Sequence, residues 1–190
     1  MKSKIFDLIK SSESIVLLTH ETPDGDAIGS VLAFYHMLTS INKSVDIVLP
    51  KLPNTFKNLL SIDRIVEKTE KNYDLAIVLD CASKARIGQI NDTLVNCKKS
   101  IAIDHHMSNA LYCDFNYVEG ESAACCQVIY YLFKEWNIDF NKDIGTALAT
   151  GLLTDTNGFA HKEVNKDSFL MAADLIDLGI DLHELYYSTR

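Results

Sequence analysis

The chain has 190 residues, of which 47% are hydrophobic, so it can bury one full core as a single domain, and no Gly/Pro-rich linker divides it. Its net charge of −8 argues against a general nucleic-acid-binding surface, because phosphate backbones are held mainly by clustered Lys and Arg. The five cysteines form no Cys-x-x-Cys pair, which favours buried thiols in a reducing cytosol over disulfides or structural zinc.

The N-terminal ten residues are too charged and too short for a signal peptide. No apolar stretch of the sequence is long enough to cross a bilayer. We therefore expect a cytoplasmic protein that does not act at a membrane.

Residues 1–40 predict two helices and a strand around a polar loop. Residues 3–10 have an amphipathic helical pattern, and the apolar run 14–19 predicts a buried strand. A second helix should follow the loop, because apolar residues recur there at helical spacing: Ile28, Val31, Leu32 and Tyr35. The loop between strand and helix carries three candidate ligands: His20, Asp24 and Asp26. Taken alone, Asp-Gly-Asp also fits an ordinary turn.

The middle of the chain predicts two strands with a less regular segment between them. Residues 44–49 form the first strand, and residues 62–66 are too short to assign. The continuous apolar run 73–80 is typical of a central parallel strand and ends in Asp80, which by itself would also fit a helix cap. Between the strands, a prolyl loop precedes a short helical segment through Phe56, Leu59 and Leu60.

A further buried strand over residues 101–103 stops at an acid and two imidazoles, Asp104, His105 and His106. Neighbouring residues on an extended chain point opposite ways, so we expect one histidine to bind a metal and the other to act on the substrate. Residues 115–118 predict one more strand.

Three helices are predicted in the last third of the chain. Ser122 should cap the first, whose apolar face we assign to the core: Cys125, Val128, Ile129, Leu132, Phe133 and Trp136. The second contains small residues that permit close packing, and it runs to Asp155. The third begins near Asp167, breaks near Gly179 and has this apolar face: Phe169, Ala172, Ala173 and Ile176.

These elements predict an α/β fold with a doubly wound, mostly parallel sheet and helices on both faces. Such a sheet brings the polar segment ends together at one edge, where ligands bind. The gathered carboxylates would repel one another unless cations neutralised them. Oxygen-rich ligation with one or two imidazoles suits Mn²⁺ or Mg²⁺, and Asp80 on the central strand is the expected bridge between two ions.

Four ordered motifs resemble those of the DHH phosphoesterase family: His20-x-x-x-Asp24-x-Asp26, Asp80, Asp104-His105-His106 and Gly151-x-x-x-Asp155-Thr156. The resemblance spans nearly the whole chain. The residues around His20 and the segment from Asp104 to Asn109 are most similar to the branch of oligoribonucleases and 3′-phosphoadenosine-5′-phosphate phosphatases. The resemblance implies a catalytic domain over residues 1–190, and we expect the family's smaller C-terminal substrate-binding domain to be absent from this chain.

The resemblance also implies a set of roles for these residues. One Mn²⁺ would be held by His20, Asp24 and Asp80, and the other by Asp26, Asp80, His105 and Asp155, with Mg²⁺ or Co²⁺ as alternatives. Asp104 would orient His105. His106 would contact a substrate phosphate or assist the leaving group, and Asn109 would add a hydrogen bond. The reaction would be in-line attack of an activated water on phosphorus.

The implied function is hydrolysis of short oligoribonucleotides or small nucleotides such as 3′-phosphoadenosine 5′-phosphate by a manganese-dependent phosphoesterase. Long duplex nucleic acid is not an expected partner, and a homodimer is one option for the assembly. The alternatives are a cyclic-dinucleotide phosphodiesterase, an inorganic pyrophosphatase, a RecJ-type exonuclease and a non-catalytic, metal-dependent nucleotide-binding module. The sequence departs from its relatives at residues 122–127, where they often have Ser-Ser-Thr-x-Glu.

Overall fold

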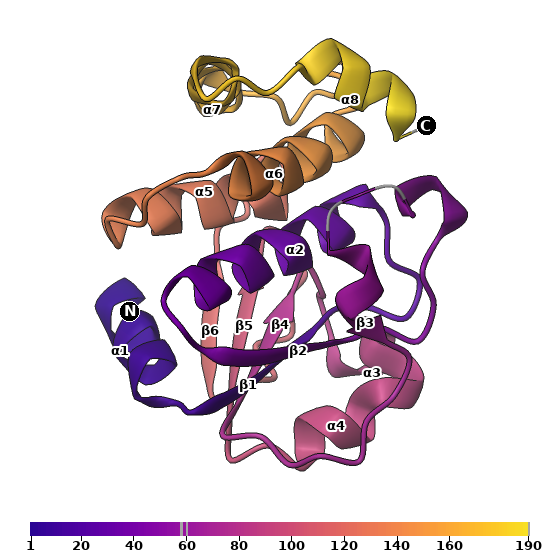
Figure 1. Ribbon diagram of the computed structural model, residues 1–190, viewed down its shortest axis with the longest axis vertical. Coiled ribbons are helices and arrows are strands. Elements are labelled where there is room, and N and C mark those ends of the chain that lie inside the picture. The colour runs from indigo at the N-terminus through magenta and orange to yellow at the C-terminus, as the bar shows by residue number, and fades with distance from the viewer. Residues whose placement is uncertain (58, 60, 190) are drawn as a thin grey trace.

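A six-stranded parallel sheet forms the centre of the computed structural model, which describes residues 1–57, 59 and 61–189 (Figure 1). The strands lie in the order β3-β2-β1-β4-β5-β6. Their bounds are β1 Ser14–Leu18, β2 Ser44–Val48, β3 Ile65–Val66, β4 Leu75–Leu79, β5 Lys99–Asp104 and β6 Phe115–Val118. The predicted doubly wound α/β fold is confirmed.

Helices cover both faces of this sheet (Figure 1). One face carries α1 Lys2–Ser11, α2 Gly25–Ser40 and α5 Cys125–Glu135, with α6 Lys142–Asp155, α7 Lys166–Asp177 and α8 Leu182–Ser188 stacked outside them. The other face carries the short helices α3 Lys84–Ile87 and α4 Asn91–Val95. Three single 3₁₀ turns complete the described elements: Asn54–Phe56, Ile62–Arg64 and Gly88–Ile90.

Successive side chains of each central strand point to opposite faces of the sheet, and this produces two separate hydrophobic cores. In β1, Ile15 and Leu17 pack toward α1 and α2, whereas Val16 and Leu18 pack toward α3 and α4. Successive side chains of a strand point to opposite faces, so an all-apolar run fills both layers at once. This explains why the continuous apolar runs in the sequence identify central strands.

The strand order reverses between β1 and β4, and this reversal positions the polar residues. The chain moves outward from β1 to β2 and β3, then returns to β4 on the other side of β1. The crevice outside the carboxyl ends of two such strands is the usual ligand site of an open α/β sheet. His20 follows β1 and Asp80 follows β4, so both lie at this crevice.

Two expectations about the helices were wrong. Ser122 does not cap α5, whose first residue is Cys125 and whose N-cap position is Ala124, without a side-chain hydrogen bond. On α7 the buried face is shifted by one residue: Ser168, Met171, Ala172 and Leu175 are buried, whereas Phe169 and Ile176 are more than half exposed. Both faces have helical spacing, and only the direction from which α6 packs selects one of them.

The segment around Phe56 is a single 3₁₀ turn, Asn54–Phe56, with Leu59 packed at the edge of the core. Leu60, which we placed in this segment, lies outside the described residues.

Candidate metal centre

Asp24 and Asp26 have different tasks in the loop after β1. The Asp24 carboxylate accepts hydrogen bonds from the backbone N–H groups of Asp26 and Ala27, at 3.1 and 3.0 Å, and so caps α2. Asp26 is 1% exposed and points away from its own helix. Its carboxylate accepts from the N–H groups of Cys125 and Cys126, at 2.5 and 2.9 Å. Asp26 therefore takes the capping role in α5 that we expected of Ser122.

Asp80 lies at the centre of the site in an uncommon backbone conformation. Its φ of +51° is left-handed, a region that Asp and Asn tolerate better than most residues. The side chain is buried, and its Oδ1 atom has no hydrogen-bond partner among the described residues. Burial, followed by repulsion from Asp26 and Asp24, raises the pKa of Asp80 well above its usual value. A buried acceptor without a donor favours a bound cation at this position.

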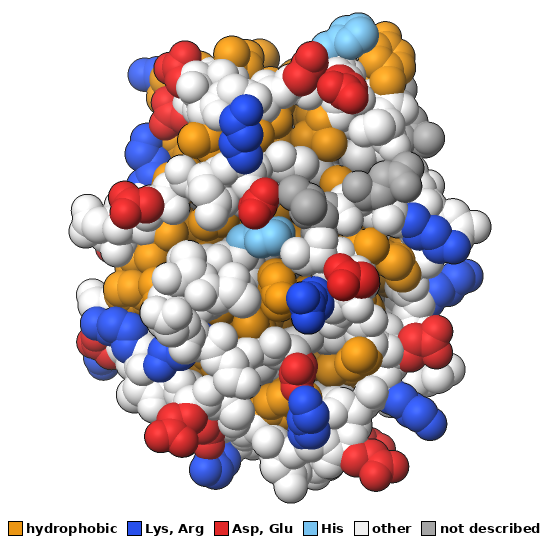
Figure 2. Space-filling view, in the orientation of Figure 1, with side chains coloured by type: hydrophobic (Ala, Val, Ile, Leu, Met, Phe, Trp, Pro, Cys, Tyr) orange, Lys and Arg blue, Asp and Glu red, His pale blue; other side chains and the backbone are white. Residues whose placement is uncertain are grey.

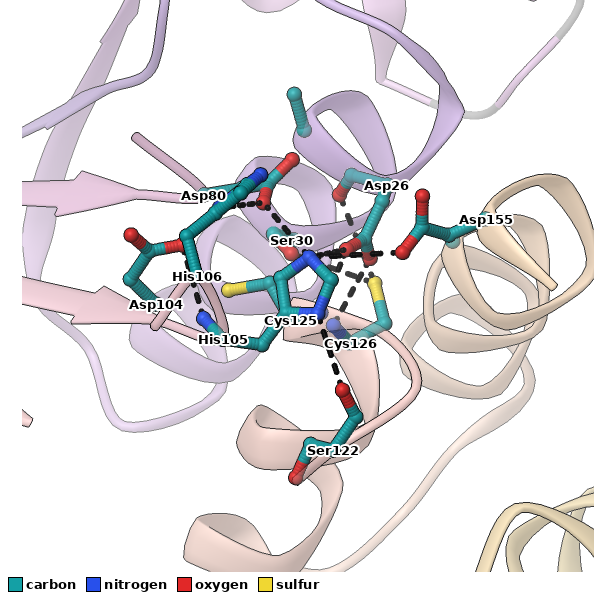
Figure 3. Close-up of polar contacts among 12 residues, drawn as sticks. Asp26, Ser30, Asp80, Asp104, His105, His106, Ser122, Cys125, Cys126 and Asp155 are labelled. Atoms are coloured by element: carbon teal, nitrogen blue, oxygen red, sulfur yellow. Dashed lines mark hydrogen bonds and ion pairs between the residues drawn. The ribbon is translucent and has the colours of Figure 1, made fainter. Parts of the chain in front are cut away.

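His105 is held in the tautomer that a metal ligand needs (Figure 3). Its Nδ1 lies 3.1 Å from the backbone carbonyl of Ser122, and because a carbonyl only accepts, Nδ1 carries the proton. Nε2 is then the ring atom left to bind a metal, and it faces three carboxylates, 3.5 Å from Asp155, 3.6 Å from Asp80 and 3.9 Å from Asp26. The ring is thus preorganised as an electron-pair donor.

The expectation that Asp104 orients the His105 ring was wrong. From His105, Asp104 accepts a hydrogen bond of the backbone N–H but none of the ring. The ring that donates to Asp104 is that of His106, whose Nδ1 lies 2.7 Å from Asp104 Oδ1. This hydrogen bond raises the pKa of His106. Burial alone would raise the pKa of Asp104, but the hydrogen bonds from His106 and Asn109 bring it below its usual value. Asp104 and His106 therefore form a charge-assisted pair beside the metal-ligand candidates.

Asn109 supports this pair from within the protein. Its amide nitrogen donates to Asp104 Oδ2 at 2.7 Å and to the carbonyl of Cys81 at 3.3 Å. Its amide oxygen accepts from the N–H of Leu111 at 2.8 Å. A hydrogen bond from Asn109 to the substrate stays a prediction.

Three groups of side chains in the site have the donor atoms and spacing of metal ligands. Within each group the donor atoms all lie within 4.8 Å of one another: His20, Asp24 and Asp80; Asp26, His105 and Asp155; and Asp80, His105 and His106. The first group has the same residues as one expected ligand set, and the second has three of the four residues of the other set, without Asp80. The third uses His106 Nδ1, 3.6 Å from Asp80, but that atom donates its proton to Asp104 and has no lone pair to offer.

The charges of the site also fit divalent cations. In the described part of the chain, none of the five carboxylates of the site forms an ion pair with Lys or Arg. Burial and the neighbouring Asp26 raise the pKa of Asp155 to about 6, and burial lowers the pKa of His20. Crowded carboxylates beside imidazoles are the ligands that Mn²⁺ and Mg²⁺ accept.

Sequence reasoning missed two kinds of group beside the site: main-chain donors and one further histidine. The N–H groups of Cys125 and Cys126 hold Asp26, although both side chains belong to the core as expected. His161 lies beside Asp155, with its Nδ1 2.8 Å from the Asp155 carbonyl. The short spacing between His161 and Asp155 was a usable signal, whereas nothing in the sequence marks a main-chain donor.

Gly151 leaves the space that Asp26 needs. A Cβ atom at this position would lie 2.5 Å from Asp26 Oδ1 and 2.2 Å from Cys126 Sγ. We expect Gly151→Ala to lower stability by about 1–3 kcal/mol through overpacking and to weaken metal binding by displacing Asp26. Gly145→Ala on the same helix is the control, because its Cβ would meet the end of the Leu178 side chain. Thermal unfolding and metal titration check this, and unchanged metal affinity in Gly151→Ala would contradict the displacement of Asp26.

The comparison with protein families matches residues 14–152 of this chain to the N-terminal domain of the DHH family. The matched residues include β1, β4 and β5 and the ligand candidates that follow them. The chain belongs to the DHH family.

Similar proteins extend the match over nearly all of this DHH chain. The bifunctional oligoribonuclease and PAP phosphatase NrnA of Thermus thermophilus is 30% identical over 95% of the chain and 55% of its own length. The protein of the same name from Bacillus subtilis is 26% identical over 100% of the chain and 62% of its own length. The DHH chain therefore spans between half and two thirds of these curated relatives.

Solved structures share the DHH chain's fold. An exopolyphosphatase-related protein from Bacteroides fragilis has a TM-score of 0.89 and 25% identity, covering 99% of the chain and 59% of its own. A protein proposed to be a family II inorganic pyrophosphatase, from Methanococcus jannaschii, has a TM-score of 0.69 and 20% identity, covering 92% of the chain and 60% of its own. The second likeness concerns the fold alone.

Proposed function

We propose that this chain is a two-metal-dependent phosphoesterase, supported by Mn²⁺, that hydrolyses short oligoribonucleotides or small nucleotides such as 3′-phosphoadenosine 5′-phosphate. The observation that carries the proposal is the buried Oδ1 of Asp80, which accepts no hydrogen bond from any residue that the structure describes and faces the Nε2 of His105 at 3.6 Å. The other carboxylate oxygen of Asp80 lies 3.9 Å from the Nε2 of His20. One carboxylate between two sets of donors is the arrangement expected of a bridging ligand.

Each remaining residue has a task in this proposal. Bound divalent ions would lower the pKa of a water molecule and neutralise the phosphoryl oxygens. His20 and Asp24 would complete one ligand set, and Asp26, His105 and Asp155 the other. His106 is one-third exposed at its side chain and bears a proton stabilised by Asp104, so it would protonate the leaving oxygen.

The proposed substrate class is supported by the names of the relatives and by the surface charge. On the face shown in Figure 2, Lys and Arg side chains are dispersed among Asp and Glu and do not form one basic stripe. Such a surface favours short or small anionic substrates held at the metal centre over long duplexes held along a groove. Within the described residues, every helix is too short or too polar to cross a bilayer. A cytoplasmic location and a homodimer stay proposals.

The proposal is tested by hydrolysis of a panel with Mn²⁺ and with chelator. The panel holds bis(p-nitrophenyl) phosphate, a diribonucleotide, 3′-phosphoadenosine 5′-phosphate, a cyclic dinucleotide and pyrophosphate. We expect chelator-sensitive cleavage of the diribonucleotide or of 3′-phosphoadenosine 5′-phosphate. Cleavage of pyrophosphate or the cyclic dinucleotide alone would select an alternative phosphoesterase. Metal binding without cleavage of any member would identify a non-catalytic module.

The pair of Asp104 and His106 predicts a specific pH effect. Asp104→Asn removes the negative charge that raises the pKa of His106, so the imidazole loses its proton at lower pH. Because His106 acts as an acid in this proposal, activity falls as pH rises through its pKa. We expect the alkaline limb of the pH–rate profile to move to lower pH in Asp104→Asn. An alkaline limb that does not move would exclude His106 as the acid.

A further inference from the structure

Arg86 is a cation at the edge of an acidic site, and no acid among the described residues forms an ion pair with it. It lies on α3, directly after the loop that follows Asp80, and its side chain is exposed. The other described arginine, Arg64, pairs with Asp63, whereas no ion pair of Arg86 is found among the described residues. An exposed guanidinium without a carboxylate partner is available to bind an anion.

The backbone of Arg86 is fixed against the loop that carries His20. The carbonyl of Arg86 accepts a hydrogen bond from the N–H of Glu21 at 2.8 Å. Two residues later, Gly88 has a φ of +65° and packs directly against the Glu21 side chain, since an added Cβ would lie 2.0 Å from Glu21 Oε2. Arg86 therefore keeps its position relative to the metal-ligand candidates without help from its own side chain.

The charge of Arg86 acts on two imidazoles of the site. Burial is the largest cause that lowers the pKa of His20, and the Arg86 charge lowers it further. The hydrogen bond from Asp104 raises the pKa of His106, and the Arg86 charge opposes this rise. The backbone hydrogen bond to Glu21, the residue after His20, places Arg86 on this side of the site, and the two charge effects agree with that placement.

We propose that Arg86 binds a second, non-scissile phosphate group of the substrate and so selects nucleotides that carry two phosphates. The inference rests on the proposed function, in which the phosphate that is cleaved lies among the metal ligands. A guanidinium recognises phosphate by two parallel N–H···O bonds, which fix the orientation of the group as well as attract it. With the non-scissile phosphate beside Arg86, the nucleotide would be held with its scissile phosphate at the metal centre, next to His106.

The test compares Arg86→Ala with Lys84→Ala, a matched control that removes an exposed cation from the same helix. The substrates are adenosine 3′,5′-bisphosphate, adenosine 3′-monophosphate and adenosine 5′-monophosphate, each with Mn²⁺. In the wild-type protein we expect the bisphosphate to have the lowest KM. In Arg86→Ala its KM should rise about tenfold or more at little-changed kcat, while the kinetics of the monophosphate that is hydrolysed stay the same. Lys84→Ala should behave as wild type, and Arg86→Lys should regain part of the loss.

Several outcomes overturn the inference. An equal loss on bisphosphate and monophosphate would assign Arg86 to the scissile phosphate, and unchanged kinetics would assign it no role. Binding of adenosine 3′,5′-bisphosphate, measured by calorimetry with Mn²⁺, separates this inference from the proposed function. Weaker binding in Arg86→Ala without turnover by any variant would support the Arg86 site and contradict the phosphoesterase. Turnover together with equal binding in the wild type and in Arg86→Ala would support the phosphoesterase and contradict the Arg86 site.

Discussion

Replacing Asp80 by alanine is expected to remove metal binding at both ligand groups and to lower turnover by roughly a thousandfold or more. The reason is that one carboxylate lies between the donors of both groups, 3.9 Å from His20 and 3.6 Å from His105. Metal content by mass spectrometry and hydrolysis of the panel measure the two effects. Full activity in this variant would contradict the two-metal proposal.

A second variant, Asp80→Asn, separates the effect of losing the carboxylate charge from the effect of backbone strain at this position. Asp80 has a φ of +51°, which costs alanine about 1–2 kcal/mol but which asparagine tolerates. Asp80→Asn therefore keeps the backbone and removes the charge, and it should lose metal and activity as Asp80→Ala does. If Asp80→Asn bound both metals normally, the loss in Asp80→Ala would be due to the backbone.

The same variant should be more stable than the wild type when both are kept in chelator. Burial and the neighbouring acids raise the pKa of Asp80 in the folded protein, so its ionised form opposes folding. The wild-type protein without metal should therefore lose stability as pH rises above the unfolded-state pKa of about 4. Thermal unfolding of both proteins in chelator should show a smaller loss in Asp80→Asn. Adding Mn²⁺ should stabilise only the wild type.

Replacing His106 and His105 one at a time should separate two imidazoles that are adjacent in sequence. His106→Ala is expected to keep its metal content and to lower kcat by about 10²–10⁴-fold, because its ring donates to Asp104 and, in the proposed mechanism, protonates the leaving oxygen. His105→Ala should lose metal, because its Nε2 faces three carboxylates. Both variants need metal analysis and single-turnover kinetics. The opposite pattern, with metal lost in His106→Ala and kept in His105→Ala, would reverse the two assignments.

The sequence was sufficient to find every strand except the two-residue β3, and to find the candidate ligands. Buried parallel strands are continuous apolar runs, and each of β1, β4 and β5 ends where polar residues begin. Because parallel strands share one direction, their carboxyl ends meet at one edge, and His20, Asp80 and His105 come together there. The order of the four motifs along the chain then indicated the DHH family.

The sequence did not determine which partner each polar group chooses. Asp104 is followed in sequence by two histidines, either of which it could bind. The backbone conformation after β5 places the ring of His106 at hydrogen-bonding distance from the Asp104 carboxylate. The ring of His105 is held by the carbonyl of Ser122, a main-chain group that no residue type specifies. On α7, the packing of α6 decided between two apolar faces and left Phe169 at the surface.

By itself, then, the sequence determined the longer strands, the longer helices and the set of acids and imidazoles, because periodicity and residue type are local properties. The short elements β3, α3, α4 and α8 were not predicted, because each offers too few residues for a periodic pattern. Only the tertiary structure decided that Asp26 caps a helix a hundred residues away and that Arg86 lies beside His20 and His106. These contacts join segments that are distant in sequence. Their geometry depends on how α5 and α3 dock on the sheet, and side-chain spacing along one chain segment carries no information about that docking.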